Sequence, residues 1–155
     1  HPSRYALVEL ENIHDAALEF EPIHRIVAKT DPMALLHALE ASACAADGFP
    51  VQWKAGDQSG TLLLDRAKGQ LAVGVLQHFL DAYLTDHPGE VDYIHDDDVL
   101  LHLASQEQSI GFLLPNLEKS QLFRGVIADG VLPRKTFSMG HAREKRYYLE
   151  GRRIR

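Results

Sequence analysis

Hydrophobic and polar positions alternate at the start of the chain. Between residues 5 and 11 every second position is apolar: Ala6, Val8 and Leu10. This period of two predicts a β-strand. Residues 20–27 predict a second strand, interrupted near Pro22 because proline cannot donate a hydrogen bond to a neighbouring strand.

A helical period follows these extended segments. Asp31 is a typical N-cap, Pro32 suits the first helical position, and Gly48 is a stop signal. The apolar positions between them share one helix face: Leu35, Leu36, Leu39 and Ala43. Residues 51–55 and 61–65 then alternate around a polar, glycine-rich loop, which predicts a β-hairpin.

The next long segment predicts a second helix. From Gln70 to the stop signal at residues 87–89, pairs of apolar residues recur every four positions. This spacing leaves Gln77, His78 and Asp81 on the face that points away from the core.

Shorter elements complete the predicted order. We expect a strand at 91–95, a helix capped by Asp96 or Asp97, and a buried strand at 109–114. A last helix would run from Asn116 to Gly130 with its apolar side chains inside: Leu122, Phe123, Val126 and Ile127. Residues 133–155 are basic and aromatic, and alternation of Tyr147 and Leu149 predicts an edge strand.

This order of strands and helices predicts the fold class. Hairpin-like strands come first, and later strands are separated by helices. We therefore expect an α/β (α+β) layered domain with a mixed β-sheet and about four helices.

Length and composition fit one globular domain over residues 1–155. The chain is 45% hydrophobic and 25% charged, and it has no apolar run of the roughly 18 residues that a membrane helix needs. The lone Cys44 cannot form an internal disulfide, which predicts a reducing, cytoplasmic location. Because the chain opens at His1 without a methionine or a signal peptide, we expect a piece of a longer polypeptide.

The net charge of −6 hides an uneven distribution. Residues 1–118 carry 6 Lys and Arg against 19 Asp and Glu, a net −13, whereas residues 119–155 carry 10 against 3, a net +7. A basic segment on an acidic body can contact a phosphate, fold back on the body or serve a neighbouring domain. The acidic total argues against duplex nucleic acid as a partner.

The first cluster of candidate chemistry lies where one predicted strand ends and the next begins. Asn12, His14 and Asp15 precede His24 and Arg25. Imidazole, carboxylate and guanidinium groups can hold a phosphate or a metal. Asn and Asp in such connections also lock turns by bonding the backbone.

Two further clusters carry opposite charge. His95, Asp96, Asp97 and Asp98 follow a strand, where carboxylates can bind Mg²⁺ or cap a helix. The segment 132–141 contains cations, hydroxyls, glycine and His141, which suits either an anion site or a solvated basic loop. Known phosphate-loop, dinucleotide, nucleophile-elbow and metalloprotease motifs are absent, and Cys44 on an alanine-rich face reads as an inert small side chain.

The chain resembles the C-terminal half of the prokaryotic family called domain of unknown function 1015 (DUF1015). Six segments carry the resemblance in the family's order: 5–15, 21–27, 76–81, 92–95, 110–115 and 132–141. The resemblance implies a longer protein whose N-terminal half, missing here, would be this domain's partner. In the family that half has an element similar to the nucleotide-binding motif of ParB-like proteins. The resemblance also groups four histidines of this chain as one candidate site: His14, His24, His95 and His141.

We therefore expect a domain that contributes to a site for a phosphate-bearing or nucleotide-type small molecule, with Mg²⁺ or a nucleotide as cofactor. The candidate catalytic residues are His14, His24 and His141. The candidate ligand-binding residues are Asn12, Arg25, Arg134, Lys135 and Thr136. The candidate metal ligands are Asp15, His95 and Asp96.

Two other hypotheses remain open from the sequence. The chain can be a non-catalytic structural or interaction domain whose basic segment docks on its own acidic body or on a second copy, giving a homo-oligomer. It can also contact RNA through cations interleaved with an aromatic side chain: Lys135, Arg143, Lys145, Arg146 and Tyr147.

Overall fold

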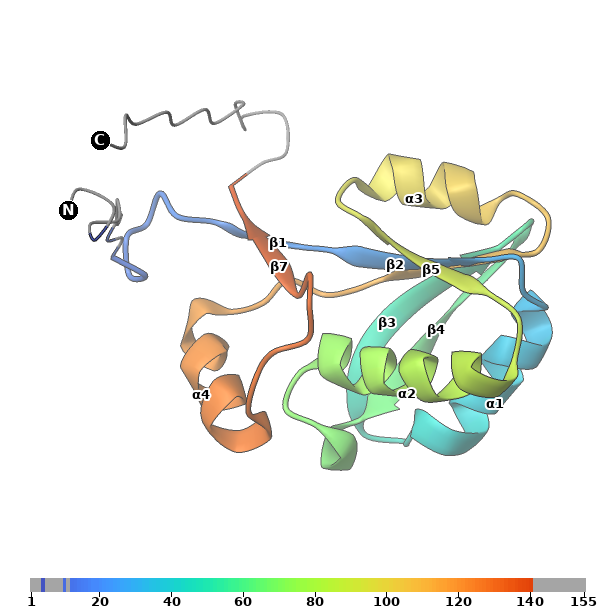
Figure 1. Cartoon of the computed structure of the whole chain (residues 1–155), viewed down its shortest axis with the longest axis horizontal. Helices are drawn as coiled ribbons and strands as arrows, with labels where there is room; N and C mark the ends of the chain where they lie inside the picture. Colours follow the sequence, from blue (N-terminus) through green and yellow to red (C-terminus); the bar gives the residue numbers. More distant parts are fainter. Residues whose placement is uncertain (1–3, 5–9, 11, 141–155) are drawn as a thin grey trace.

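A five-stranded antiparallel sheet organises the chain in the computed structural model, which describes residues 4, 10 and 12–140 (Figure 1). The strand order across this sheet is β4-β3-β6-β2-β5. The strands are β2 (His24–Ala28), β3 (Gly48–Ala55), β4 (Gln58–Asp65), β5 (Glu90–Ile94) and β6 (Ser109–Leu113). A separate two-stranded sheet pairs β1 (Phe20–Pro22) with β7 (Phe137–Met139).

The fold class is confirmed as α+β with helices layered on a sheet, but the expected mixed sheet is wrong. Every described strand pair is antiparallel. Strands joined by a helix do run parallel to each other, as helical crossovers require. However, β6 lies between β2 and β3, and β2 lies between β5 and β6. Parallel strands are therefore never neighbours.

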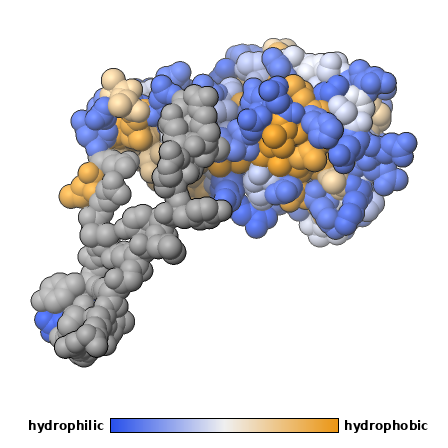
Figure 2. Space-filling model, turned by 90° about the horizontal axis from the view of Figure 1, so that it is seen from above, coloured by the Kyte–Doolittle hydropathy of each residue, from blue (hydrophilic) through white to orange (hydrophobic). Residues whose placement is uncertain are grey.

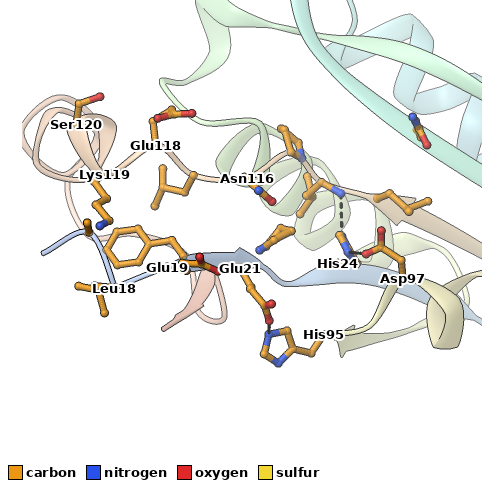
Figure 3. A pocket seen from close by; sticks show the side chains of 18 of the residues that line it. Leu18, Glu19, Glu21, His24, His95, Asp97, Asn116, Glu118, Lys119 and Ser120 are labelled. Carbon is orange, nitrogen blue, oxygen red and sulfur yellow. Dashed lines mark hydrogen bonds and ion pairs between the residues drawn. The ribbon is translucent and has the colours of Figure 1, made fainter. Parts of the chain in front are cut away.

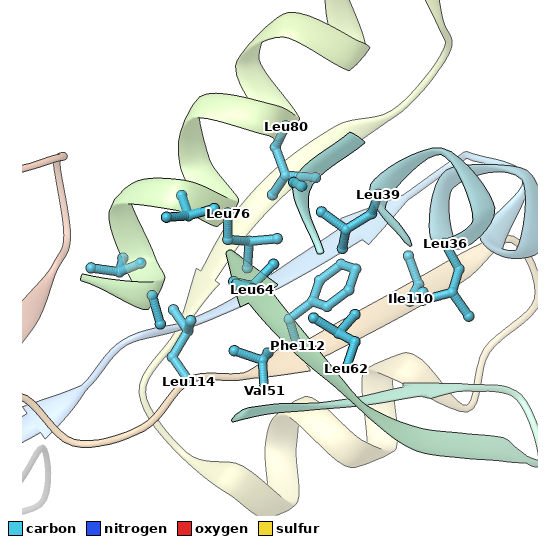
Figure 4. Close-up of a cluster of buried hydrophobic side chains, with 14 of the residues drawn as sticks. Leu36, Leu39, Val51, Leu62, Leu64, Leu76, Leu80, Ile110, Phe112 and Leu114 are labelled. Carbon is cyan, nitrogen blue, oxygen red and sulfur yellow. The ribbon is translucent and has the colours of Figure 1, made fainter. Parts of the chain in front are cut away.

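Helices cover both faces of the five-stranded sheet (Figure 1). On one face α1 (Pro32–Ala43) and α2 (Ala72–Asp86) form the main core with Val27, Leu64 and Phe112 (Figure 4). On the other face α3 (Asp97–Ala104) packs on Ile26 through Leu100 and Ala104. This contact is close, because a Cβ atom at Gly111 of β6 would lie only 2.9 Å from the Ala104 side chain.

Local sequence signals account for most element boundaries. The Asp31 side chain accepts hydrogen bonds from the amides of Met33 and Ala34, as expected of an N-cap. The four predicted stripe residues of α1 are all buried. The predicted hairpin forms as β3 and β4, and Gly56 adopts the left-handed φ of 57° that a two-residue turn needs.

The last helix, α4 (Lys119–Asp129), differs from the prediction. Glu118, not Asn116, is its N-cap, in a capping box with Gln121. Its expected inner face is largely exposed, with Phe123 at 61% and Ile127 at 84% of their free surface. The helix packs instead through Gly125, whose open backbone lies against Leu71.

The surface of the described residues is mainly polar. On the face seen from the α3 side, polar residues surround one patch of hydrophobic residues on the larger part of the domain (Figure 2). None of the described helices has the length and apolar character needed to cross a bilayer. The strand expected at 5–11 and the edge strand expected around Tyr147 fall almost entirely outside the described residues.

Burial predicts a sharp contrast between two leucine-sized side chains. Leu76 of α2 has no exposed surface, whereas Ile127 of α4 is 84% exposed. We expect Leu76→Ala to lower the free energy of unfolding by about 2–5 kcal/mol, and Ile127→Ala to change it by less than about 0.5 kcal/mol. Urea unfolding measures both values, and equal losses would show that α4 is buried in solution.

Candidate functional site

A cavity of about 1070 Å³ opens beside β1 and the start of β2, against the segment that leads from β6 into α4 (Figure 3). Its size is in the range of sites for small molecules. We call it the histidine cavity because His14, His24 and His95 all line it. The fourth candidate, His141, lies outside the described residues.

The sheet explains how residues far apart in sequence reach one cavity. His24 begins β2 and lies opposite Ile94, the last residue of β5. His95 is the next residue along the chain, so strand pairing places it at the same edge as His24. His14 comes from the exposed turn that precedes β1.

His24 is held on both ring nitrogens (Figure 3). Its Nδ1 atom accepts a hydrogen bond of 3.0 Å from the backbone amide of Leu114. The ring proton therefore belongs on Nε2, which donates to Oδ1 of Asp97 at 2.6 Å. Only 2% of His24 is exposed, whereas 66% of the Asp97 side chain is, so the pair presents its carboxylate to the cavity.

Asp97 belonged to the acidic cluster and was a possible N-cap from the sequence, but Asp96 was the candidate metal ligand. In the structure Asp96 is the N-cap of α3 and accepts from the amide of Val99. Asp97 occupies the first position of the helix and turns toward His24. The signal was available, since only one carboxylate in a run of three can cap the helix and the next is free for another partner.

His95 forms a second pair of histidine and carboxylate. Its Nε2 atom contacts Oε2 of Glu21, which extends from β1 (Figure 3). Both side chains are about four-fifths buried. This contact is an ion pair and not a hydrogen bond, and among the described residues no hydrogen bond to either ring nitrogen is found, so the imidazole can exchange a proton with a bound molecule.

The turn before β1 uses its polar side chains for its own backbone. Asn12 Oδ1 accepts from the amide of His14 at 3.0 Å, and Asp15 Oδ1 accepts from the amide of Ala17 at 2.9 Å. The ammonium group of Lys119 at the start of α4 donates to the Asp15 carbonyl. Asn12 and Asp15 thus shape the loop that carries His14.

The predicted metal ligands do not come together. Asp15 and Asp96 bond backbone amides in separate loops, and His95 contacts Glu21. Within residues 4, 10 and 12–140, no group of three histidine, cysteine, aspartate or glutamate side chains is arranged to hold a metal ion. The geometry therefore gives no support to the expected Mg²⁺ site at these residues.

Arg25, a predicted ligand residue, is fully buried and serves the fold. Its Nε atom donates to Gln77 Oε1 at 2.8 Å, and its Nη1 and Nη2 atoms donate to the carbonyls of Lys135 and Arg134 at 2.9 and 3.1 Å. Burial lowers the pKa of Arg25 to about 10, which still leaves the guanidinium charged at neutral pH.

The position of Gln77 differs from the sequence prediction, which placed this side chain on the solvent-facing side of the helix. It is only 4% exposed, and its amide links Arg25 to the carboxylate of Asp81, to which Nε2 donates at 2.8 Å. A buried guanidinium needs a polar partner, and this amide reaches it from α2.

The predicted anion loop is shaped, but its three candidates point to different places. Arg134 donates from Nε to the hydroxyl of Tyr93 at 2.7 Å. Lys135 is exposed, with a left-handed φ of 56°. Thr136 is buried and donates to the Pro133 carbonyl at 2.6 Å. These residues therefore do not form a common anion site.

Cys44 behaves as the sequence suggested. Burial raises the pKa of its thiol, and the nearby carboxylate of Glu40 raises the pKa further. A raised pKa disfavours the thiolate, which is the nucleophilic form.

We expect the substitution Arg25→Lys to destabilise the fold although it keeps the positive charge. Arg25 reaches its partners from three different nitrogen atoms, whereas lysine carries all its donors on one, so Arg25→Lys should lower the free energy of unfolding by about 2 kcal/mol or more. Arg66→Lys is the matched control, because that guanidinium is half exposed beside Asp47 and should matter by less than about 0.5 kcal/mol. Urea unfolding that gives equal losses would contradict the structural role of Arg25.

The hydrogen bonds of His24 predict one ring tautomer. We expect long-range ¹H–¹⁵N correlation spectra to show His24 protonated at Nε2, because Nδ1 accepts from Leu114. His37, which is exposed and serves as the control, should not be restricted to one ring tautomer. A His24 signal from the Nδ1-protonated form would contradict the pairing with Asp97.

Comparisons of the chain with family models, with curated proteins and with solved structures find no match. The resemblance to the DUF1015 family, and the N-terminal partner region that it implies, therefore remain predictions. A function for the histidine cavity has to follow from its own geometry and chemistry.

Proposed function

We propose that this domain binds a small polar molecule in the histidine cavity and that His95, oriented by Glu21, exchanges a proton with it. The observation that carries the proposal is the convergence of two pairs of histidine and carboxylate on one cavity. Their histidines lie at the ends of neighbouring strands, so the sheet fixes the distance between the pairs.

The lining suits a small organic ligand. Apolar side chains, among them Leu18, Phe20 and Leu117, alternate around the cavity with groups that can form hydrogen bonds. Binding sites for small molecules typically combine such an apolar wall with a few fixed polar groups.

Charge favours a ligand with hydroxyl or amino groups over a phosphate. The Asp97 carboxylate is 66% exposed and lines the cavity with Glu118, whereas Lys119, the one lysine of the described lining, donates to the Asp15 carbonyl. Carboxylates accept hydrogen bonds from hydroxyl and ammonium groups and repel phosphate. We therefore replace the phosphate-type ligand expected at the histidines with a polyol, sugar or amine.

The two pairs would have different roles. His24 has both ring nitrogens occupied, so it positions Asp97 as an acceptor for a ligand donor. His95 keeps Nδ1 for proton exchange, and the Glu21 carboxylate stabilises the imidazolium that forms when Nδ1 takes a proton. Only His95 of the two is placed to act as a general acid or base.

The binding part of the proposal is tested with the whole chain. Neutral sugars, polyols and aliphatic amines are titrated while backbone amide signals are followed by NMR. We expect at least one of these classes to give saturable shifts at His95, Asp97 and Leu114, and Asp97→Asn to weaken that ligand about tenfold through the loss of a charged acceptor. Binding that leaves these signals unchanged would contradict the proposal.

The proton-exchange part has its own readout. Calorimetric titration in two buffers of different ionisation enthalpy reports protons taken up or released on binding. We expect proton-linked binding in the wild type and its loss in His95→Gln, with His37→Gln as the matched exposed control. Unchanged proton linkage in His95→Gln would show that His95 does not exchange the proton.

A further inference from the structure

A second cavity, of about 670 Å³, lies between the start of α2 and the segment that precedes β7. None of its described lining residues borders the histidine cavity. We call it the cationic cavity after two of those residues, Lys68 and Arg134; His78 lines it as well. The proposal made here concerns this cavity and is independent of the function proposed above.

The cationic side chains have donors to spare. Arg134 uses Nε for Tyr93, and the described residues occupy neither Nη1 nor Nη2. Lys68 and His78 likewise form no hydrogen bond or ion pair with any part of the chain that the structure describes. These donors line a hollow of ligand size and are free to meet an anion there.

The carboxylates at this cavity are already committed. Asp129 Oδ2 accepts from the backbone amide of Gln70 at 2.7 Å. Asp81 Oδ1 accepts from the side chain of Gln77 at 2.8 Å. Each carboxylate thus accepts a hydrogen bond from the protein, whereas the Lys68 ammonium group and the Nη1 and Nη2 atoms of Arg134 have no partner among the described residues.

Arg25 lies directly behind the cavity and adds a third fixed positive charge. It donates to the carbonyl of Arg134 and to the side chain of Gln77, which lines the cavity. Burial lowers the pKa of Arg25, Tyr93 and Asp81 raise it, and the charge of Arg134 lowers it, so the two guanidinium groups repel each other although Asp81 offsets part of that repulsion. A bound anion would reduce this repulsion.

The first turn of α2 opens on the same cavity through Leu71 and Gly74. Leu71 is the N-cap but has no side chain that could bond the first amides. A Cβ atom at Gly74 would meet nothing within 4 Å, so the space above this turn is open. The partial positive charge of the helix start therefore adds to that of the side chains.

We propose that the cationic cavity binds a phosphate monoester, with the phosphate between Lys68 and Arg134. The organic part of the ligand would lie on Leu71 and Leu132. It also has room in an adjoining hollow of about 200 Å³, which shares Lys68 and His78 and is otherwise mainly apolar. Of the three anion ligands predicted from the sequence, this site retains only Arg134.

The test uses phenyl phosphate and inorganic phosphate with the whole chain. We expect phenyl phosphate to bind more tightly, because its ring occupies apolar surface, and to shift the amide signals of Gly69, Leu71 and Gly74. Lys68→Gln and Arg134→Gln should each weaken binding about tenfold by removing one charged donor. Lys135→Gln, which removes the same charge from the neighbouring exposed position, should leave the affinity unchanged.

Three results would overturn the proposal. An equal loss in Lys135→Gln would reveal general electrostatic attraction to the basic segment. Shifts at His95 instead of Gly74 would move the phosphate to the histidine cavity. The absence of saturable binding in the millimolar range would remove the site. Thermal unfolding of each variant shows whether a loss of affinity reflects a loss of fold.

Discussion

The guanidinium of Arg25 is buried against the sheet, and the arrangement around the cationic cavity depends on it. Among the described residues no carboxylate forms an ion pair with it, so its charge is stabilised by hydrogen bonds and by the ring of Tyr93, 4.6 Å away. Those bonds draw the Gln77 amide into the interior and fix the carbonyls of Arg134 and Lys135. Arg25 thereby holds the loop that contains Arg134 and Lys135 against the sheet, because it bonds the backbone carbonyl groups of that loop and not its charged side chains.

Neighbouring residues of β2 serve opposite faces of the sheet, as strand geometry requires. His24 and Ile26 face α3, where His24 meets Asp97 and Ile26 packs with Leu100. Arg25 and Val27 face α2 and the main core. His24 therefore positions the Asp97 carboxylate beside the histidine cavity, and its neighbour Arg25 positions the loop of residues 134–135 beside the cationic cavity.

Sequence patterns predicted the features that depend on near neighbours. The Asp31 cap, the apolar stripe of α1 and the β3–β4 hairpin are determined within a few residues, and all three formed. Gln77 and α4 were misplaced because their surroundings come from distant segments. The burial of Gln77 depends on a guanidinium 52 residues away, and the apolar side of α4 finds no sheet face to cover it. Strand pairing likewise brought His24 and His95, 71 residues apart, to one cavity, which no local pattern predicts.

The uneven charge of the chain gains a structural meaning from these two cavities. The carboxylates that orient histidines come from the acidic body, whereas Arg134 comes from the basic segment. At the histidine cavity two carboxylates contact imidazole rings, whereas Asp81 and Asp129 at the cationic cavity accept hydrogen bonds from Gln77 and Gln70. Separating the two groups on different sides of β2 lets each keep the environment that its chemistry needs.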